Sequence, residues 1–444
     1  MTKIATTNQP NIEQLIPEFA QLPQAIRQCM PTQSERWNMM EAHSGHKNNV
    51  DLNQAIQNKN WKWPKRRLYV ITDPHADAEA FVASLIVTGG VVKTGKHNDD
   101  FKLTKAGKKS TFIIGGDCLD KGPSNLALLS SIQHLMQLGA NVKLLAGNHD
   151  MRLFMGIHAL GLKRKPVTEH LFVRMGEKVV PLFQEVHERY LKGKKFSKKI
   201  PDEAECKKRL FPKENWFEQF PIAADGFMTE AAIKRELNGM YKKIDVFELA
   251  CRRAGLSMRD VYATALKCRA LFLQPKGEFA WFYREMQLAY RSGSFLFIHA
   301  GLDDGIIQTI SKKSVRYINK QFRQHIETDL FHFYYGSLAN TMRTKYRSAD
   351  LTLSDFGVKR LYQQGLYAVV HGHLNRMYGQ RIVLKQGLIH IECDITLDRH
   401  SRQKEGLTGY GMGVTIIDPQ KRVLGLSCDY PLVKIFEPDG YFKH

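Results

Sequence analysis

The sequence predicts an α/β fold whose functional loops lie together at one edge of a mostly parallel sheet. Two observations support this prediction. After residue 66, a short apolar run, a polar loop and a segment with helical apolar spacing follow one another, and the unit then repeats. Repeats of this kind place the loops at the carboxyl ends of parallel strands. Beyond residue 380, strands follow one another without helices, which predicts an antiparallel closing segment.

The predicted strands are short and rich in β-branched or aromatic residues. The first comprises Leu68–Thr72, and the helix predicted after it, Ala78–Val87, stops at a Gly-Gly pair that is a suitable helix end. The other strands have the same character, and the last two form a predicted hairpin: Thr111–Gly115, Val142–Ala146, Ser294–Ile298, Leu366–Val370, Arg381–Leu384, Leu388–Cys393, Gly413–Ile417 and Arg422–Ser427.

Changes in composition divide the chain into three regions. Residues 1–66 are polar and contain five prolines, which predicts an N-terminal appendage with short helices within residues 11–30. Residues 67–157 and 292–444 carry the sheet pattern and form the predicted core. Residues 158–291 are basic and have helical apolar spacing, which predicts a cap-like helical insertion.

Four segments of the insertion are predicted to be helices, because their apolar residues recur three and four positions apart: Thr229–Lys243, Val246–Arg253, Met258–Phe272 and Glu278–Ser292. The insertion also contains a lysine-rich run over residues 192–199, which forms either a solvated loop or a contact for a polyanion. Later in the chain, the aromatic run over residues 331–335 is predicted to be a loop.

The composition is typical of a soluble globular protein. Hydrophobic residues make up 43% of the 444 residues and charged residues 25%, which excludes disordered and fibrous classes. No apolar run approaches the roughly 18–20 residues of a membrane span, and the N-terminus lacks a secretory pattern, so a cytoplasmic location is expected. The seven cysteines are scattered and contain no C-x-x-C pair, which argues against a disulfide framework or a structural zinc site.

The charge balance is the one extreme property of the composition. The chain has 65 lysines and arginines against 44 aspartates and glutamates, a formal net charge of +21. Such a field attracts polyanions, whether nucleic acid, an acidic membrane surface or a phosphorylated partner, and mainly accelerates encounter. The charge alone leaves the class of partner open.

Five predicted strands end in residue types that bind metals. A pair of divalent metals requires a shared carboxylate, together with imidazoles, further carboxylates or a carboxamide. Any one of these residues is more simply explained as a turn residue or as a hydrogen-bonded histidine. Their recurrence at five successive strand ends favours a metal centre, and the residues are Asp73 and His75; Asp117 and Asp120; Asn148 and His149; His299; and His371 with His373.

These segments, in this order, resemble the signature of the calcineurin-like metallophosphoesterases. The segments are Asp73-Pro74-His75, Gly116-Asp117-Cys118-Leu119-Asp120, Gly147-Asn148-His149-Asp150, His299-Ala300-Gly301 and Gly372-His373. Within the superfamily, Asp117–Pro123 is similar to the corresponding motif of phosphoprotein phosphatases. The sequence GNHDMRLFMG resembles that of Shewanella-like phosphatases or of diadenosine tetraphosphatases. The resemblance implies a four-layer α/β/β/α sandwich.

The resemblance also implies roles for these residues. Asp73, His75 and Asp117 would hold one metal, and Asp117 would bridge to a second metal held also by Asn148, His299 and His373. A hydroxide that bridges the metals would attack phosphorus in line, because two Lewis acids lower the pKa of water and clamp the phosphoryl oxygens. His149 would be the general acid, and Asp120 would orient it. The expected cofactors are two divalent metals, with Mn²⁺ first and Fe, Zn or Ni as alternatives.

Several positions depart from the family pattern. Lys121 replaces an arginine that grips phosphate with two donors, so it keeps the charge but loses the fork. Asn375 stands where phosphodiesterases often have a metal-binding histidine, which favours a phosphatase. Arg152 and Arg343, with Lys121, are the predicted phosphate contacts. His371 is either a residue that supports the ligands or itself a ligand.

Three functions are compatible with the sequence. The first is a metal-dependent phosphatase that hydrolyses phosphate monoesters of a phosphoprotein or a small molecule. The second is a phosphodiesterase or dinucleoside polyphosphate hydrolase that acts on nucleotides or nucleic acid, which the +21 charge and the basic insertion support. The third is a non-catalytic polyanion-binding protein. The third is disfavoured because metal ligands and a proton donor are all present.

Overall fold

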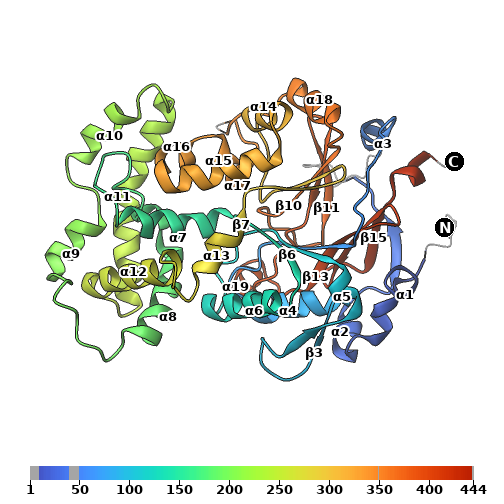
Figure 1. The fold of residues 1–444 in the computed structure, drawn as a ribbon, viewed down its shortest axis with the longest axis horizontal. Helices are drawn as coiled ribbons and strands as arrows, with labels where there is room; N and C mark the ends of the chain where they lie inside the picture. Colours follow the sequence, from blue (N-terminus) through green and yellow to red (C-terminus); the bar gives the residue numbers. More distant parts are fainter. Residues whose placement is uncertain (1–9, 40–49, 349, 443–444) are drawn as a thin grey trace.

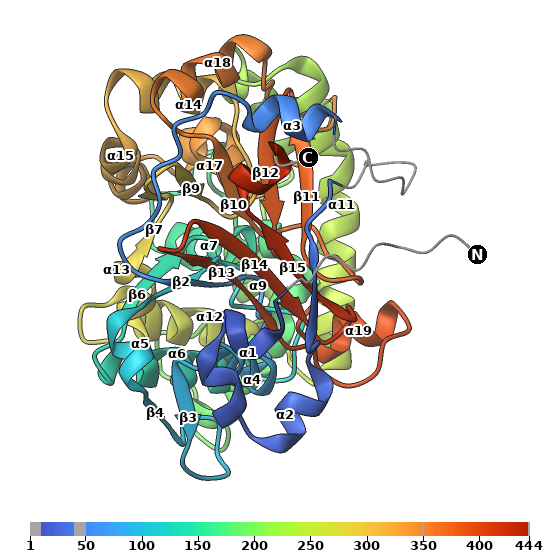
Figure 2. The ribbon, with the colours of Figure 1, turned by 90° about the vertical axis from the view of Figure 1, so that its right-hand side faces the viewer.

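The computed structural model describes residues 10–39, 50–348 and 350–442. Two β-sheets form its centre, and helices cover the outer face of each (Figures 1 and 2). Every strand predicted from the sequence is present, with ends shifted by no more than two residues. Within the described ranges, no helix is both long and apolar enough to cross a membrane.

The larger sheet has eight strands in the order β1-β15-β14-β13-β2-β5-β6-β7. Strands β2, β5, β6 and β7 are parallel, and β13, β14 and β15 continue the sheet as an antiparallel meander. The strand bounds are Gln33–Arg36 for β1, Leu68–Ile71 for β2, Thr111–Ile114 for β5, Asn141–Leu145 for β6, Met286–Gln287 for β7, Gly413–Asp418 for β13, Arg422–Ser427 for β14 and Leu432–Phe436 for β15.

The smaller sheet has five strands in the order β11-β12-β10-β9-β8, of which β9, β10 and β12 are parallel. The two sheets pack face to face. Along β2, Leu68 and Val70 belong to the core between the sheets, whereas Tyr69 and Ile71 belong to the core under the helices. The bounds are Tyr290–Ser292 for β8, Phe295–Phe297 for β9, Ala368–His371 for β10, Arg381–Lys385 for β11 and Leu388–Glu392 for β12.

Helices on the two outer faces complete four layers, α/β/β/α, which confirms the predicted fold class. The larger sheet is covered by α4 (Ala78–Val87) and α6 (Asn125–Gln137), and the smaller sheet by a group at the opposite side of the molecule (Figure 2). That group comprises α14 (Asp304–Lys312), α15 (Val315–Thr328), α16 (Leu330–Tyr335), α17 (Ser337–Arg343) and α18 (Asp355–Gln363).

The helical segments between β6 and β7 gather at the end of the molecule farthest from both termini (Figure 1). They follow α7 (Asn148–Ala159), which begins at the ligand tetrad. Two short 3-10 turns, η2 (Val173–Met175) and η3 (Glu177–Val179), precede the long helices. The helices are α8 (Val180–Tyr190), α9 (Glu203–Leu210), α10 (Trp216–Ala224), α11 (Glu230–Arg253), α12 (Met258–Leu273) and α13 (Ala280–Glu285).

Two expectations for this region are wrong in detail. The helices predicted over Thr229–Lys243 and Val246–Arg253 form one helix, α11, because no residue between them interrupts the backbone hydrogen bonds. The last predicted helix, Glu278–Ser292, ends at Glu285, and the chain then enters strands β7 and β8. Pairing with two sheets outweighs the helical spacing at this point. The lysine-rich run over residues 192–199 is exposed between α8 and α9.

The aromatic run over residues 331–335 is helical, not a loop as predicted. Asp329 caps α16 by accepting a hydrogen bond from the backbone nitrogen of His332 at 3.1 Å. Phe331, Phe333 and Tyr334 are buried. Bulky residues lower helix propensity, but burial of these rings against the neighbouring helices outweighs it.

The remaining elements lie at the two ends of the chain and at the sheet edges. The N-terminal region contains the expected short helices and also β1, an edge strand of the larger sheet that was not predicted. Residues 91–103 form the antiparallel hairpin β3–β4. The bounds are α1 (Ile12–Leu15), η1 (Pro17–Gln21), α2 (Gln24–Cys29), α3 (Val50–Ile56), β3 (Val91–Lys93), β4 (Phe101–Leu103), α5 (Lys105–Lys109), α19 (Arg399–Lys404) and η4 (Pro438–Phe442).

Candidate metal centre and active site

The fold brings all five ligand segments to one place. They follow β2, β5, β6, β9 and β10, whose carboxyl ends point the same way within each parallel set. Parallel register groups the loops within each sheet, and the packing of the two sheets against each other brings the two groups together. The backbone nitrogen of His373 donates to both carboxylate oxygens of Asp73, 300 residues away, at 3.0 and 3.2 Å.

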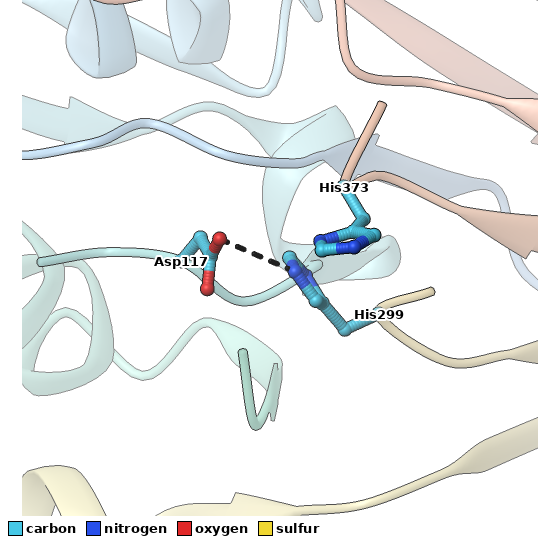
Figure 3. Close-up of side chains that lie close together, drawn as sticks. All are labelled: Asp117, His299 and His373. Atoms are coloured by element: carbon cyan, nitrogen blue, oxygen red, sulfur yellow. Dashed lines mark ion pairs between the residues drawn. The ribbon is translucent and has the colours of Figure 1, made fainter. Parts of the chain in front are cut away.

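Two groups of metal-ligating atoms overlap at this edge. One consists of Asp73, His75 and Asp117, and the other of Asp117, His299 and His373; the ligand atoms within each group lie within 4.8 Å of one another. Asp117 belongs to both groups, and Figure 3 shows it facing the two histidines of the second. Its Oδ2 lies 3.3 Å from Nε2 of His299 and 3.9 Å from Nε2 of His75. The arrangement provides a shared carboxylate between two sets of donors.

The loops that carry these ligands are held in a costly backbone conformation. Seven non-glycine residues in them have positive φ, a region that costs about 1–3 kcal/mol per residue. The seven are Asp73, His75, Ala76, Asp117, Asp120, Lys121 and His373. Two glycines permit the loops to approach each other: a Cβ at Gly147 would lie 2.0 Å from the backbone nitrogen of Asp117, and one at Gly372 would lie 1.8 Å from Oδ2 of Asp73.

Hydrogen bonds on the far side of each imidazole direct the other ring nitrogen towards the centre. Nδ1 of His299 contacts the carbonyl oxygen of Gly115 at 2.8 Å, and Nδ1 of His75 contacts that of Leu119 at 3.2 Å. Each Nδ1 therefore carries a hydrogen, which leaves Nε2 as the ring nitrogen that faces the carboxylates. A metal at this place would bind Nε2 instead of a proton.

Asn148 and His373 approach each other on the opposite side of Asp117. With its amide nitrogen turned towards them, Asn148 donates to Nδ1 of His373 at 2.9 Å and to the carbonyl oxygen of Met342 at 3.2 Å. Nε2 of His373 is buried and has no hydrogen-bond partner among the described residues. The carboxamide predicted from the sequence therefore lies beside the second donor group.

Burial and crowding shift the ionisation of these groups in opposite directions. Burial raises the pKa of Asp73, and the carboxylate of Asp394 raises it further. Burial also acts to raise the pKa of Asp117, but the surrounding imidazoles, with His299 contributing most, lower it well below its ordinary value. Burial opposes protonation of His299, whereas Asp117 and Asp73 raise its pKa to about 10. The carboxylates thus create a field that favours a cation.

His149 lies at the edge of the centre and is paired with Asp120. Nδ1 of His149 is 2.8 Å from Oδ2 of Asp120, and its Nε2 is 3.9 Å from Oδ2 of Asp117. Burial raises the pKa of Asp120, while Arg152 acts against this rise. The contact occupies Nδ1, which leaves Nε2 as the ring nitrogen that can exchange a proton with a ligand.

Asp150, which had no role predicted from the sequence, connects the ligand loops. Its Oδ1 accepts hydrogen bonds from the backbone nitrogens of Cys118 and Leu119 at 2.9 and 3.1 Å, and its Oδ2 accepts one from Gly147 at 3.1 Å. The carboxylate therefore fixes the loop that contains Asp117 relative to the start of α7. The hydrogen bond from Gly147 to Asp150 is the one by which a capping box closes the N-terminus of a helix.

Lys121 and His371 are placed differently from the other predicted site residues. Nζ of Lys121 lies 2.7 Å from Nε2 of His75, so that an ammonium group occupies the direction in which that histidine would bind a metal. His371 is buried, and its Nε2 contacts Nδ1 of His390 at 3.1 Å. His371 is in neither group of metal-ligating atoms within the described residues, which leaves it a supporting position behind the ligands.

A cavity of about 560 Å³ opens over the centre and is lined mainly by cations. His75, Asp117, Asn148, His149 and His373 form its acceptor side. Eight lysines and arginines also line it, against two aspartates, Asp117 and Asp350: Lys121, Arg152, Arg174, Lys178, Arg343, Lys345, Arg347 and Arg376. The predicted phosphate contacts Lys121, Arg152 and Arg343 are thus all at the cavity.

Four further residues at the site were not singled out from the sequence. Asp394 follows β12, is 1% exposed and has an Oδ2 without a hydrogen-bond partner among the described residues. Its position directly after a buried strand is the signal that could have identified it. Arg174, Lys178 and Tyr334 line the cavity from η2, η3 and α16. No local pattern distinguishes these three from other basic or aromatic residues of the chain.

The sequence comparison agrees with the geometry. Residues 66–253 match the family model of the calcineurin-like phosphoesterases. The resemblance expected from the motifs is therefore confirmed over these residues. The match includes the segments from Asp73 to Asp150 but ends before His299 and His373, which the fold adds to the same centre. No curated protein sequence matches the chain significantly.

Solved structures of similar shape include two phosphatases. A cold-active protein-tyrosine phosphatase of a psychrophile, Shewanella sp., is 13% identical, with 91% of each chain covered and a TM-score of 0.39. A protein serine/threonine phosphatase from Saccharomyces cerevisiae with similarity to human phosphatase PP5 is 11% identical, with 87% of this chain and 86% of that chain covered and a TM-score of 0.37. At these scores the likenesses decide nothing about the substrate of this chain.

Proposed function

We propose that this chain is a dinuclear metal-dependent phosphatase that hydrolyses phosphate monoesters. The observation that carries the proposal is the pair of donor groups that share Asp117. A shared carboxylate between two sets of nitrogen and oxygen donors is what two divalent metals a few ångströms apart require. Fold and family support hydrolysis of a phosphoric ester, and the choice of monoesters is our inference from the departures listed above.

The donors fit two metals. Asp73 and His75 with Asp117 would hold one, and Asn148, His299 and His373 with Asp117 the other. The fit rests on Nε2 of His75 and of His299, which face Asp117, and on the ring of His373, whose ligand atom lies within 4.8 Å of those of Asp117 and His299. When bound, two divalent ions would lower the pKa of water towards about 7 and withdraw charge from the phosphoryl oxygens.

His149 would supply the proton to the leaving group. Its Nε2 faces the cavity, and Asp120 holds the ring through Nδ1 at 2.8 Å. The backbone nitrogen of His149 also donates to Oδ1 of Asp117 at 2.8 Å, which fixes the first turn of α7 relative to the centre. A positioned acid of this kind contributes about a hundredfold to ten-thousandfold in rate.

Arg152, Arg343 and Lys121 would bind the phosphoryl oxygens that face away from the metal ligands. Arg152 is half-buried, and the guanidinium of Arg343 lies 5.0 Å from the ring centre of Tyr334. Neither arginine forms a hydrogen bond or ion pair through its side chain with the described residues. Cations without carboxylate partners in a cavity favour an anionic ligand.

The proposal is tested by metal content and by the choice of ester. After growth with added Mn²⁺, mass spectrometry is expected to find about two metals per chain, and an aryl phosphomonoester is expected to be hydrolysed faster than the matching diester. Faster hydrolysis of the diester would replace the proposal by the phosphodiesterase alternative. Absence of both metal and turnover would leave the non-catalytic alternative.

A further inference from the structure

A group of cations, which includes the proposed phosphate contacts Arg152 and Arg343, extends the cavity away from the metal centre. We define the cationic wall as Arg152, Arg174, Lys178 and Arg343, with the hydroxyl of Tyr334 among them. These side chains come from α7, η2, η3, α17 and α16, and all of them line the cavity over the centre. Segments that are far apart in the sequence therefore form one basic surface.

A neighbouring cavity of about 390 Å³ continues this surface. It shares Arg152, Arg174 and Lys178 with the first cavity, and it adds Lys242 and Lys243 from α11. One carboxylate, Glu177, also lines it. The two cavities with their shared lining form a basic path that begins at the metal ligands and ends under α11.

Arg174, in the middle of the wall, is held in place by buried partners. Nη1 of Arg174 donates to both carboxylate oxygens of Glu236 at 2.8 Å, and its Nη2 donates to the hydroxyl of Tyr334. Glu236 is 6% exposed. Gly176, at a φ of 71°, separates η2 from η3 and permits the turn that places Arg174 and Lys178 on the same side.

The hydroxyl of Tyr334 reports how strong the positive field is. Burial alone would raise its pKa, but Arg174, Arg152 and Arg343 lower the pKa of Tyr334 to about 7. Because the oxygen accepts from Arg174, its hydrogen is left to donate into the cavity. Partial burial lowers the pKa of Lys178, and Lys121 and Arg152 lower it further. Both effects are relieved when an anion binds between these groups.

We propose that the cationic wall is a second phosphoryl subsite, so that the preferred substrate carries a chain of two or more linked phosphoryl groups. The inference rests on the proposed function, because the terminal phosphoryl group, linked through one bridging oxygen like that of a monoester, would lie at the metal centre; the preferred substrate is then a phosphoanhydride. A dianionic phosphoryl group matches several convergent cations better than a single carboxylate does. The ligand class is an oligophosphate, either inorganic or attached to a nucleoside.

The reaction on such a substrate is hydrolysis of a phosphoanhydride. Water forms a new bond to the terminal phosphorus, and the bond from that phosphorus to the bridging oxygen breaks. The bridging oxygen keeps the electron pair as part of the shortened chain. One proton of the water stays with orthophosphate, and the other passes to solvent or to the leaving oxygen, which His149 is placed to reach. Water is the only co-reactant.

Binding to metal-free protein tests the subsite independently of catalysis. Calorimetric titration of the chelator-treated, dialysed full chain is expected to show one site for tripolyphosphate, at least tenfold tighter than for orthophosphate. Lys178→Gln should weaken tripolyphosphate binding about tenfold, since a charge-assisted hydrogen bond is lost. Lys234→Gln, on the exposed face of α11, removes the same charge from the insertion and should change the affinity less than twofold.

Several results would overturn the inference. If Lys178→Gln and Lys234→Gln weaken tripolyphosphate binding equally, the chain attracts the anion only through its net charge, and the wall is not a subsite. If a singly phosphorylated acidic peptide binds as tightly as tripolyphosphate, the ligand of the wall is a phosphorylated protein and not an oligophosphate. Comparison of tripolyphosphate with a nucleoside triphosphate decides between the two sources of the phosphoryl chain, and tighter binding of either one than of orthophosphate supports the subsite.

The failure of this inference can be distinguished from failure of the proposed function. If Mn²⁺-loaded protein hydrolyses the aryl monophosphate while tripolyphosphate binding does not depend on Lys178, the phosphatase stands and the subsite is wrong. If tripolyphosphate binds as expected but neither compound is hydrolysed, the subsite stands and the phosphatase is wrong. With both correct, Lys178→Gln lowers kcat/KM for tripolyphosphate about tenfold more than for the aryl monophosphate.

Discussion

The two sides of the active-site cavity are built in different ways and attract opposite charges. We define the acceptor wall as the candidate metal ligands Asp73, His75, Asp117, His299 and His373, of which His75, Asp117 and His373 line the cavity and Asp73 and His299 lie behind them. These residues lie at strand ends and are buried except for His373, which is half-buried. The cationic wall comes from helices and 3-10 turns, and Lys178 within it is exposed. One wall is suited to cations and the other to anions, and a phosphoryl group between them would contact both.

The two walls differ in what holds their side chains in position. Ligands of the acceptor wall are fixed by the sheet register, by loops with positive φ and by hydrogen bonds to buried carbonyl groups. Members of the cationic wall are fixed one at a time, as when Glu236 holds Arg174. A change in the acceptor wall should therefore abolish the centre, whereas a change in the cationic wall should alter affinity by degrees.

Asp117→Asn, in the acceptor wall, is expected to have the largest effect on metal content and activity. Loss of the shared carboxylate charge should remove most of the bound metal and lower kcat/KM about ten-thousandfold, since two metals depend on it. Metal content and hydrolysis of an aryl phosphomonoester measure the effect. Asp202→Asn, at the N-cap of α9, is the matched control because asparagine caps a helix equally well. It should leave both the metal content and the rate of hydrolysis unchanged. An active, metal-loaded Asp117→Asn protein would exclude the shared-ligand assignment.

His149→Ala should separate proton donation from metal binding. We expect the metal content to stay unchanged and kcat to fall about a thousandfold on an alkyl phosphate, which has a poor leaving group. The loss on an aryl phosphate with an acidic leaving group should be much smaller, because that group needs no proton. Equal losses on both esters would remove the general-acid role. Loss of metal would instead place His149 among the ligands.

His170→Phe tests how much the stability of the helices that support the cationic wall depends on pH. His170 is fully buried, with Nε2 2.9 Å from the hydroxyl of Tyr335, and burial lowers its pKa to about 3. The unfolded chain therefore binds this proton below pH about 6.5 while the folded chain does not, and the free energy of unfolding falls as the pH falls. Between pH 7 and pH 5 this group contributes a loss of about 2 kcal/mol. Urea unfolding at both pH values should show a loss smaller by that amount in His170→Phe.

Arg343→Lys tests the cationic wall with the smallest change. The charge remains but the two-pronged donor and its stacking on Tyr334 are lost, so KM for an aryl phosphomonoester should rise about tenfold with little change in kcat. Arg360→Lys on α18, outside both cavities, is the control and should leave KM unaltered. A fall in kcat with constant KM would mean that Arg343 acts on the transition state alone.

The strand-end ligands were predictable from the sequence because each motif is local. Asp73 and His75 directly follow an apolar run, and the same is true of Asp117. Parallel strands of one sheet place the residues that follow them at the same edge of the sheet. The apolar runs that predict the strands were therefore enough to predict which candidate ligands lie together. The shared position of Asp117 in two donor groups agrees with that expectation.

Residues 331–335 show why other features were missed. An aromatic run without helical spacing was predicted to be a loop, yet it is α16, and it carries Tyr334 into the cavity. Its stability depends on rings buried against helices distant in the sequence. Likewise, nothing local separates Lys178 from the exposed lysines of residues 192–199, because a charged side chain has no periodicity that marks a binding site.

The sequence by itself determined the fold class, the strands and the identity and order of the metal-ligating residues, since strand patterns and the motifs that follow them are short-range. The tertiary structure alone decided the cationic wall, the supporting role of Asp150 and the position of Asp394 beside Asp73. These depend on contacts between segments tens to hundreds of residues apart, whose mutual placement is set by packing of two sheets and their helices and not by any local preference.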